Sequence, residues 1–316
     1  MRSYVVLFYG LLLLILTLVA WQLKETKSII REIPIVFVKH PVLIGRGGNF
    51  TILVNTFRRD TCLEQSLRRW LSCYPQQVRV AWNDVGRPHP DFLHELAESH
   101  RGVLVIDDHA SPNLSNRFLP RDFATEAVFS VDDDVAYSCR MVWGAFRAWK
   151  QHRDQMVGFA PRWITESNSY RWNSVCKGTD ANMIFVTKGG FLHRSMFSAY
   201  FKPELAHLRT LVDKEVTAED LLMGFVVSSQ LSLTNGSKVV VVVNRDDMIT
   251  CKARPGDKQS LGSRKKTREV RKNLTRHFRE SFGSTLVAAH PGDFYHFSER
   301  GDFERGRQHF SFKGCI

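Results

Sequence analysis

Short apolar runs alternate with amphipathic segments along the chain from Thr51 onwards. Runs rich in β-branched and aromatic residues predict strands at 51–57, 77–82, 103–106 and 127–131. Apolar residues at helical spacing predict helices at 60–72, 91–100 and 138–152. In the first helix we expect Asp60 to be the cap and Leu63, Leu67, Trp70 and Leu71 to share one face. This alternation predicts an α/β fold with a mostly parallel sheet flanked by helices.

Polar side chains follow each predicted strand, where an open α/β sheet binds its ligands. They are Thr56, Arg58, Arg59, Asn83, Asp84, Asp107, Asp108, Asp132, Asp133 and Asp134. Guanidinium, amide and carboxylate groups together can hold a nucleoside diphosphate and its metal. The glycine-rich stretch at 45–49 precedes a strand instead of following one, which disfavours a Rossmann dehydrogenase or a P-loop enzyme.

The triplet of Asp132, Asp133 and Asp134 follows an apolar run directly. Adjacent like charges repel each other, so the acids must be solvated, cap a helix or hold a cation. A solvated turn or a cap is the plain structural explanation. Because the position is the ligand-binding edge, a divalent cation held by one or two carboxylates is an equal alternative. Such a cation would neutralise charge on a leaving diphosphate.

The composition is that of a globular protein, with 43% hydrophobic and 24% charged residues in 316. The net charge of +12 is unevenly distributed along the chain. The segment from Lys252 to Arg279 alone contains eleven Lys and Arg residues but only two acids. This segment fits a phosphate, acidic glycan or membrane headgroup partner. No zinc-finger spacing or RNA-recognition motif supports nucleic acid. A stripe of Thr267, Val270, Leu274 and Phe278 predicts a packed helix whose basic residues mostly face solvent.

The N-terminus contains an uncharged apolar stretch from Tyr4 to Leu23 that is long enough to span a bilayer. A cleaved signal peptide is the alternative, but Leu18 stands where cleavage after Ala20 requires a small residue. We therefore expect a type II protein with a cytosolic tail (1–3), a transmembrane signal anchor (4–23), a stem (24–49) and one lumenal domain (50–316).

Two further features agree with a lumenal domain. Glycosylation sequons begin at Asn49, Asn113, Asn235 and Asn273. The six cysteines form no metal-like C-x-x-C pair, so disulfides are permitted, but their pairing cannot be read from the sequence.

Six segments in order resemble the exostosin-like family, the retaining α-N-acetylhexosaminyltransferases of glycosyltransferase family 64. They are TFRRDTCL, VAWNDVG, LSNRFLP, VFSVDDD, GFAPR and TAEDLLMGFVV. The triplet resembles the DxD motif of GT-A glycosyltransferases. The resemblance implies a GT-A fold, a UDP-sugar as donor substrate and Mn²⁺ as cofactor. It also implies localisation in the Golgi or endoplasmic reticulum membrane.

The resemblance also implies roles on the donor side. Arg59 would contact the nucleotide or its diphosphate, and Asn83 the uracil or ribose. Asn116 and Arg117 would hold the nucleotide and sugar. Asp132 would lie near the donor, and Asp134, with Asp133, would bind the metal. The structural alternatives are a surface residue at a helix start for Arg59 and a turn former for Asn83.

On the acceptor side, Glu219 and Asp220 match the family's C-D-D acids and are the candidate catalytic carboxylates. Arg271 matches the Arg of an R-x-x-C motif and would meet the diphosphate. The two acids could instead simply favour the dipole of a helix's first turn. The family's paired cysteines are replaced here by Ala218 and Leu274. An apolar contact between these two side chains could take the place of the disulfide.

We therefore expect transfer of GlcNAc or GalNAc from a UDP-sugar to a glycan such as a heparan-type linker or a glycosaminoglycan. One alternative is a glycolipid transferase that uses UDP-hexosamine or GDP-mannose on inositol phosphorylceramide. Another is an inactive lumenal glycan-binding or scaffold protein. The expected partners are the donor, a glycan or glycolipid acceptor and the membrane, with no nucleic acid and with a homodimer left open.

Overall fold

A computed structural model of the chain describes a set of residues beginning at Gly48. The described residues are 48–159, 161–165, 167–168, 170–172, 181–185, 188–231, 239–243, 249–251, 267–283, 294–297 and 303–306. All of them belong to one compact unit, Arg46–Ile316. Within these ranges no helix is both long and apolar enough to cross a bilayer. The expected anchor at 4–23 lies outside them.

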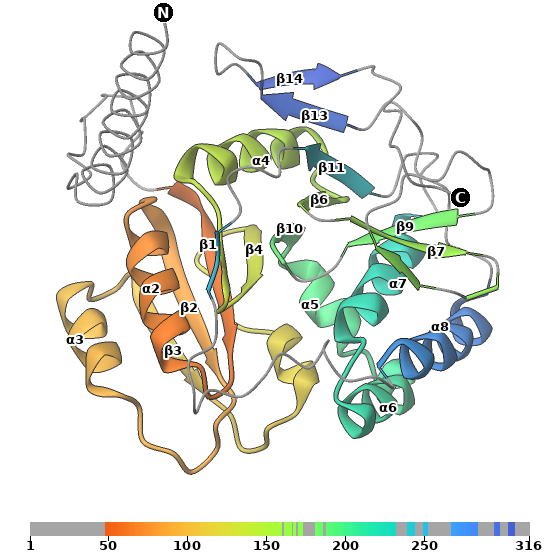
Figure 1. Ribbon diagram of the computed structural model, residues 1–316, viewed down its shortest axis with the longest axis horizontal. Coiled ribbons are helices and arrows are strands. Elements are labelled where there is room, and N and C mark those ends of the chain that lie inside the picture. The colour runs from red at the N-terminus through yellow and green to blue at the C-terminus, as the bar shows by residue number, and fades with distance from the viewer. Residues whose placement is uncertain are drawn as a thin grey trace, which may run out of the picture. The chain divides into compact units, whose positions relative to one another are not determined.

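The centre of the fold is a mixed, mainly parallel sheet (Figure 1). Among the described residues it contains β1 (Gly48–Thr56), β2 (Pro75–Trp82), β3 (Leu104–Asp108), β4 (Ala127–Asp132), β6 (Met156–Gly158), β10 (Gly190–His193), β11 (Val239–Val243), β13 (Phe294–Phe297) and β14 (Phe303–Gly306). Their spatial order is β14-β13-β11-β6-β10-β4-β1-β2-β3. Only β10 and β14 run antiparallel to their described neighbours. The predicted α/β class with a mostly parallel sheet is confirmed.

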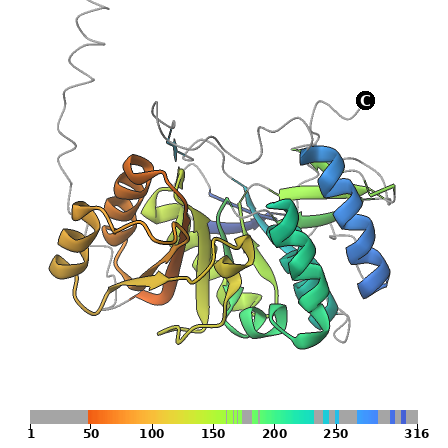
Figure 2. The same ribbon diagram turned by 90° about the horizontal axis from the view of Figure 1, so that it is seen from below.

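Helices cover this sheet. They are α2 (Asp60–Leu71), α3 (Asp91–Ser99), α4 (Cys139–Gln151), α5 (Ser195–Tyr200), α6 (Ala206–Glu215), α7 (Glu219–Leu231) and α8 (Thr267–Phe282), with 3₁₀ turns η1 (Leu114–Phe118) and η2 (Pro203–Leu205). Figure 2 shows α7 in teal and α8 in blue side by side, at the opposite end of the molecule from α2 and α3 in orange. The two ends are joined through the central strands.

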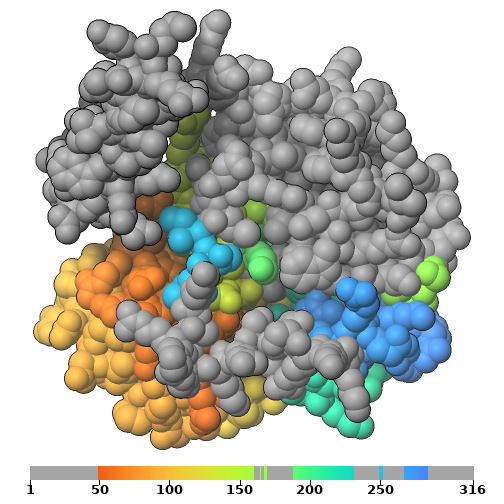
Figure 3. Space-filling model, in the orientation of Figure 1, coloured from red at the N-terminus to blue at the C-terminus, as the bar shows by residue number. Residues whose placement is uncertain are grey.

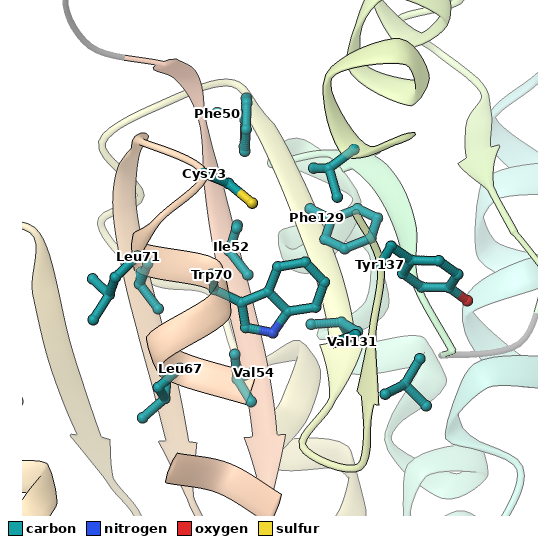
Figure 4. Close-up of a cluster of buried hydrophobic side chains, with 14 of the residues drawn as sticks. Phe50, Ile52, Val54, Leu67, Trp70, Leu71, Cys73, Phe129, Val131 and Tyr137 are labelled. Carbon is teal, nitrogen blue, oxygen red and sulfur yellow. The ribbon is translucent and has the colours of Figure 1, made fainter. Parts of the chain in front are cut away.

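Two buried clusters hold these layers together. One cluster packs α2 and α4 against the central strands, and Figure 4 shows part of it around Trp70 and Phe129. The other joins α5, α6, α7 and α8. Leu63, Leu67 and Trp70 of α2 are fully buried, as their spacing predicted. Ala218 and Leu274 both lie in the second cluster, so the positions without cysteines are filled by apolar packing.

Two small sheets stand beside the main one. β12 (Ile249–Thr250) pairs antiparallel with β5 (Val135–Ala136), and β7 (Pro161–Thr165) pairs with β8 (Tyr170–Trp172) and β9 (Ala181–Phe185). Disulfides link Cys62 to Cys251 and Cys73 to Cys139. Figure 3 shows residues near position 250, in light blue, against the orange atoms of α2. The two remaining cysteines lie outside the described residues.

The structure corrects the expected Asp60 cap and excludes one of the alternatives for the acidic triplet. Asp60 is the first helical residue of α2, and the N-cap position belongs to Arg59, which makes no side-chain capping bond. The Asp60 carboxylate instead pairs with Arg87. No helix follows the triplet directly, because β5 intervenes and Ser138 caps α4 by accepting from the Met141 N–H. The triplet is therefore not a helix cap.

Candidate functional site

The carboxyl ends of β1 and β4 bring Arg59 onto the acidic triplet. The strands pair in parallel, with Asn55 opposite Asp132, so Arg59 and the triplet leave the sheet side by side. Arg59 Nη1 donates to Asp134 Oδ2 at 2.6 Å, and its Nε donates to Asp133 Oδ2 at 3.3 Å. Asp133 is fully buried and also accepts a 2.7 Å bond from the Thr56 hydroxyl. Its Oδ1 faces the guanidinium but has no aligned hydrogen bond.

This crowding of acids changes their protonation. Burial raises the pKa of Asp133 to about 7, although Arg59 opposes the shift. Burial and the Asp132 charge likewise raise the pKa of Asp134. Burial opposes ionisation of Arg59, but Asp133, Asp134 and Asp132 more than offset it, so the pKa of Arg59 is raised. The triplet carries more negative charge than Arg59 alone neutralises, and it is not a solvated turn.

Arg117 connects the triplet to the helical half of the molecule. It comes from η1, and its side chain is 1% exposed. Its Nη1 donates to Asp132 Oδ1 at 2.5 Å and lies 3.8 Å from Glu219 Oε1, while its Nε donates to Ser130 at 3.0 Å. Burying a guanidinium is costly unless carboxylates surround it. Arg117 therefore fixes the separation between Asp132 and Glu219.

Glu219 and Asp220 open α7 and meet Arg271 from α8. Arg271 Nη1 donates to Asp220 Oδ2 at 3.3 Å, and its Nε donates to the Thr217 hydroxyl at 2.9 Å. Glu219 has a longer contact, the 3.8 Å ion pair with Arg117. Burial and the neighbouring Asp220 raise the pKa of Glu219 to about 8, against the influence of Arg117 and Arg271. Asp220 is thus paired with Arg271, while Glu219 is favoured in its neutral form near pH 7.

Two asparagines lie between β1, β2 and η1. The Asn83 amide donates to Asn55 Oδ1 at 2.9 Å and to the Thr56 and Ala81 carbonyls. The Asn116 amide donates to Asn83 Oδ1 at 3.2 Å. Both ends of the Asn83 side chain are thus engaged within the protein. To contact uracil or ribose, the Asn83 side chain would have to give up one of these hydrogen bonds.

The structure brings the site residues that the family resemblance implied into one connected network. Arg59 joins the triplet, Arg117 links Asp132 to Glu219, and Arg271 closes on Asp220. Asn116 adjoins Arg117 in η1 and bonds to Asn83. This proximity agrees with the predicted roles, which themselves stay predictions.

Asp107 and Asp108, which follow β3 at the same edge of the sheet, lie outside this network. Asp107 is paired with Arg79 and Arg121, both nearly buried. Asp108 is exposed and meets His89. Arg121 also donates to the carbonyls of Asn116 and Leu119 in and beside η1. Sequence reasoning missed Arg121, whose only signal was its position directly after the LSNRFLP segment, which ends at Pro120.

A divalent cation needs oxygen ligands, and the carboxylates of the triplet supply part of such a shell. Carboxylate oxygens are ligands that Mg²⁺ and Mn²⁺ accept, and the side chains of Asp132 and Asp134 are each about a quarter exposed, at 23% and 24%. Asp133 is committed to Arg59 and Thr56. No group of three or more His, Cys, Asp or Glu within the described ranges could hold a metal alone. The residues fit a cation whose shell is completed by phosphate and water.

A family model described as the glycosyl transferase family 64 domain matches residues 50–290. Glycosylinositol phosphorylceramide mannosyl transferase 1 of Arabidopsis thaliana is 30% identical over 204 residues, which cover 58% of this chain and 61% of that protein. Human exostosin-like 2 is 26% identical over 249 residues, or 75% of each chain.

Two further similarities cover different extents. The exostosin-like-3 homolog of Caenorhabditis elegans is 33% identical over 192 residues, which are 58% of this chain but 23% of that protein. The chain therefore spans less than two thirds of the length of the plant and nematode relatives. A solved mannosyltransferase from Pyrobaculum calidifontis, in complex with GDP-Man and Mn²⁺, is 12% identical with a TM-score of 0.43, covering 76% of this chain and 74% of that one.

Proposed function

Because this chain belongs to glycosyltransferase family 64, we propose that it transfers GlcNAc or GalNAc from a UDP-sugar to a glycan acceptor, with retention and with Mn²⁺. The family match spans most of the described domain, which is a glycosyltransferase domain of the exostosin-like group. The observation that carries the proposal is the single network joining the Asp132–Asp134 triplet to Glu219, Asp220 and Arg271.

On the donor side, Asp134, with Asp133 behind it, would hold the metal, and Arg59 would lie beside the diphosphate. A metal bound there supplies Lewis-acid neutralisation of the leaving diphosphate. Arg59 keeps the triplet in place before the donor arrives, because it already bonds to both acids. Such prior arrangement lowers the cost of ordering the site on binding.

On the sugar side, Arg117 and Glu219 would face the transferred residue. Glu219 is neutral near pH 7 because of its burial, so it can donate a hydrogen bond to a sugar hydroxyl. The Asp220 carboxylate is paired with Arg271 and can stabilise positive charge that develops at the anomeric carbon. Arg271 would also meet the diphosphate if donor binding draws α8 toward it.

The fold and the location complete the proposal. The mainly parallel sheet with a carboxylate cluster after β4 supports a GT-A fold. The charge-free stretch at 4–23 supports a type II signal anchor in the Golgi or endoplasmic reticulum, with the domain lumenal. The two disulfides agree with such an oxidising compartment.

One alternative acceptor has support of its own. Relatives named as glycosylinositol phosphorylceramide mannosyl transferase and glucosamine inositolphosphorylceramide transferase are 30% and 27–28% identical over comparable stretches. The second candidate is therefore transfer of mannose or glucosamine to an inositol phosphorylceramide glycan. The same site would serve, with GDP-mannose or a UDP-hexosamine as donor.

The deciding experiment is a thermal-shift screen of UDP-GlcNAc, UDP-GalNAc, UDP and GDP-mannose, each with and without Mn²⁺. We expect metal-dependent stabilisation by one nucleotide class, which identifies the donor. Transfer of labelled sugar to heparan-type oligosaccharides or to inositol phosphorylceramide glycans then identifies the acceptor. If no nucleotide stabilises the protein, the transferase proposal is wrong and a scaffold role takes its place.

Site variants extend this screen. Asp134→Asn should abolish the metal-dependent part of the shift, because it removes one anionic ligand. Glu64→Gln is the matched control, since Glu64 pairs with Arg68 on the exposed face of α2 and lies outside the network. Equal shifts in the two variants would contradict the metal role of Asp134.

A further inference from the structure

A short strap of the chain lies on the segment that follows the acidic triplet. In β12, Ile249 pairs with Ala136 and Thr250 with Val135. The next residue, Cys251, donates its backbone N–H to the Asp134 carbonyl at 2.8 Å. The strap therefore contacts the backbone of the proposed metal-binding acid directly.

The same strap is bonded covalently to α2. Cys251 forms a disulfide with Cys62, which lies in the first turn of α2. In that turn the Leu63 N–H donates to the Arg59 carbonyl at 2.9 Å. Arg59 in turn reaches Asp134 Oδ2 at 2.6 Å. One disulfide, one backbone hydrogen bond and one ion pair thus close a ring through Arg59, Asp134, Cys251 and Cys62.

Burial of the β12 side chains adds little to hold the strap in this position. Both residues of β12 are exposed, and Ile249 is 56% exposed despite being a large apolar residue. A two-residue ladder is marginal in water, and here only the β5 side, Val135 and Ala136, is buried. The half-cystine at Cys62, by contrast, is fully buried in α2. The disulfide therefore ties an exposed strand covalently to the buried face of α2.

We propose that the Cys62–Cys251 disulfide is a positioning device for the donor site: it fixes Asp134 and Arg59 against each other, so that donor binding depends on it. The inference rests on the proposed function for the identity of the ligand. Its structural part, the dependence of the triplet's geometry on the disulfide, stands independently of that function.

The second disulfide provides a matched control. Cys73 and Cys139 join the end of α2 to the first residue of α4, but neither bonds to the triplet. Their junction is also held by other contacts, because Cys73 is 1% exposed in the core and its carbonyl accepts from Trp143 Nε1 at 3.1 Å. Removing this bond should leave the ring around Asp134 closed.

The test compares the full-length Cys62→Ala/Cys251→Ala and Cys73→Ala/Cys139→Ala variants. Hydrogen exchange is measured for peptides that contain 135–136 and 249–251, without metal or nucleotide. We expect at least tenfold faster exchange in the first variant only. Calorimetry with UDP and Mn²⁺ should then show binding weakened about 10- to 100-fold in the first variant, the range seen when support of a metal ligand is lost.

The outcomes separate the inference from the function. If UDP does not bind to the wild-type protein, the proposed function fails, while the exchange rates still decide whether the disulfide positions the triplet. If wild type binds UDP and both variants bind it equally well, the inference is overturned. Equal acceleration of exchange in both variants would also overturn it, because the effect would then be general loss of stability.

Discussion

At the scale of single residues, Arg59 is expected to matter for stability as much as for binding. It is the described cation nearest to the fully buried Asp133, and removing one partner of a buried pair leaves an uncompensated charge. Arg59→Ala should therefore lower the free energy of unfolding by about 3–5 kcal/mol at pH 8, as measured by denaturant titration. The loss should be smaller at pH 5, where the Asp133 carboxyl can be protonated.

The matched control is Arg68→Ala, which removes an exposed pair with Glu64 on the same helix. An exposed pair of this kind contributes about 0.2–1 kcal/mol. Similar losses from the two substitutions would show that Asp133 is not the reason for the Arg59 effect.

Glu219 makes stability depend on pH in a defined window. Its pKa is raised from 4.5 to about 8 in the folded protein, so its stabilising effect is complete below pH 4.5 and is lost as the pH rises through 8. Glu219→Gln cannot ionise. Between pH 5 and pH 8 the variant should gain stability relative to wild type by up to about 1.4 kcal/mol per pH unit. Parallel stability curves for the two proteins would contradict this.

Sequence reasoning at the residue scale found the groups but not their partners. The order of segments located Arg59, Arg117, Glu219 and Arg271, and chain topology brought them together. It could not foresee that Asp107 turns to Arg79 and Arg121, because those pairs depend on side-chain direction. The Asp60 cap failed for a similar reason, since Arg87 competes for that carboxylate.

At the scale of elements, the turn between α6 and α7 is strained where it presents Glu219. Val216 has φ of 52° and ends α6 in the left-handed conformation, which disfavours a β-branched residue. Val216→Gly should therefore raise stability by about 1 kcal/mol in thermal or chemical unfolding. The same replacement at Thr210, on an exposed turn inside α6, should destabilise instead. A loss in both would exclude strain at Val216.

The elements themselves were largely predictable from periodicity. The predicted ranges agree within about three residues with helices α2, α3 and α4 and with strands β1 to β4. The agreement is good because each of these segments carries its own pattern of apolar residues. The pairing of β5 with β12 was not predictable. It joins two strands of two residues each that lie more than 100 residues apart in the chain. Two residues are too few to show an alternating pattern of apolar and polar positions.

At the scale of the whole molecule, the two disulfides should contribute measurably to stability. They close loops with sequence separations of 189 and 66 residues, and loss of a native disulfide costs about 2–5 kcal/mol. Thermal unfolding with reductant should therefore occur at a lower temperature than without it. The variant that lacks all four of these cysteines should show no such dependence, unless the two cysteines outside the described residues also form bonds.

The fold class and the family were predictable from the sequence because both depend on order along the chain. The family match over 50–290 confirms the exostosin-like resemblance. The disulfide pairing was not predictable, because six cysteines allow many pairings and the choice depends on the folded geometry. Only the structure could show that Cys251 returns to α2.

The distance in sequence between the strap and the triplet also sets an order of events during synthesis. Cys139 leaves the ribosome well before Cys251, so the Cys73–Cys139 bond can form while Cys62 still has no partner. The intervening chain of roughly 110 residues takes about 6–22 s to make at 5–20 residues/s. During that time a nascent chain already carries the acidic triplet but not its covalent support. If the Cys62–Cys251 disulfide positions the triplet as proposed, the proposed donor site is completed late, after most of the domain has been translated.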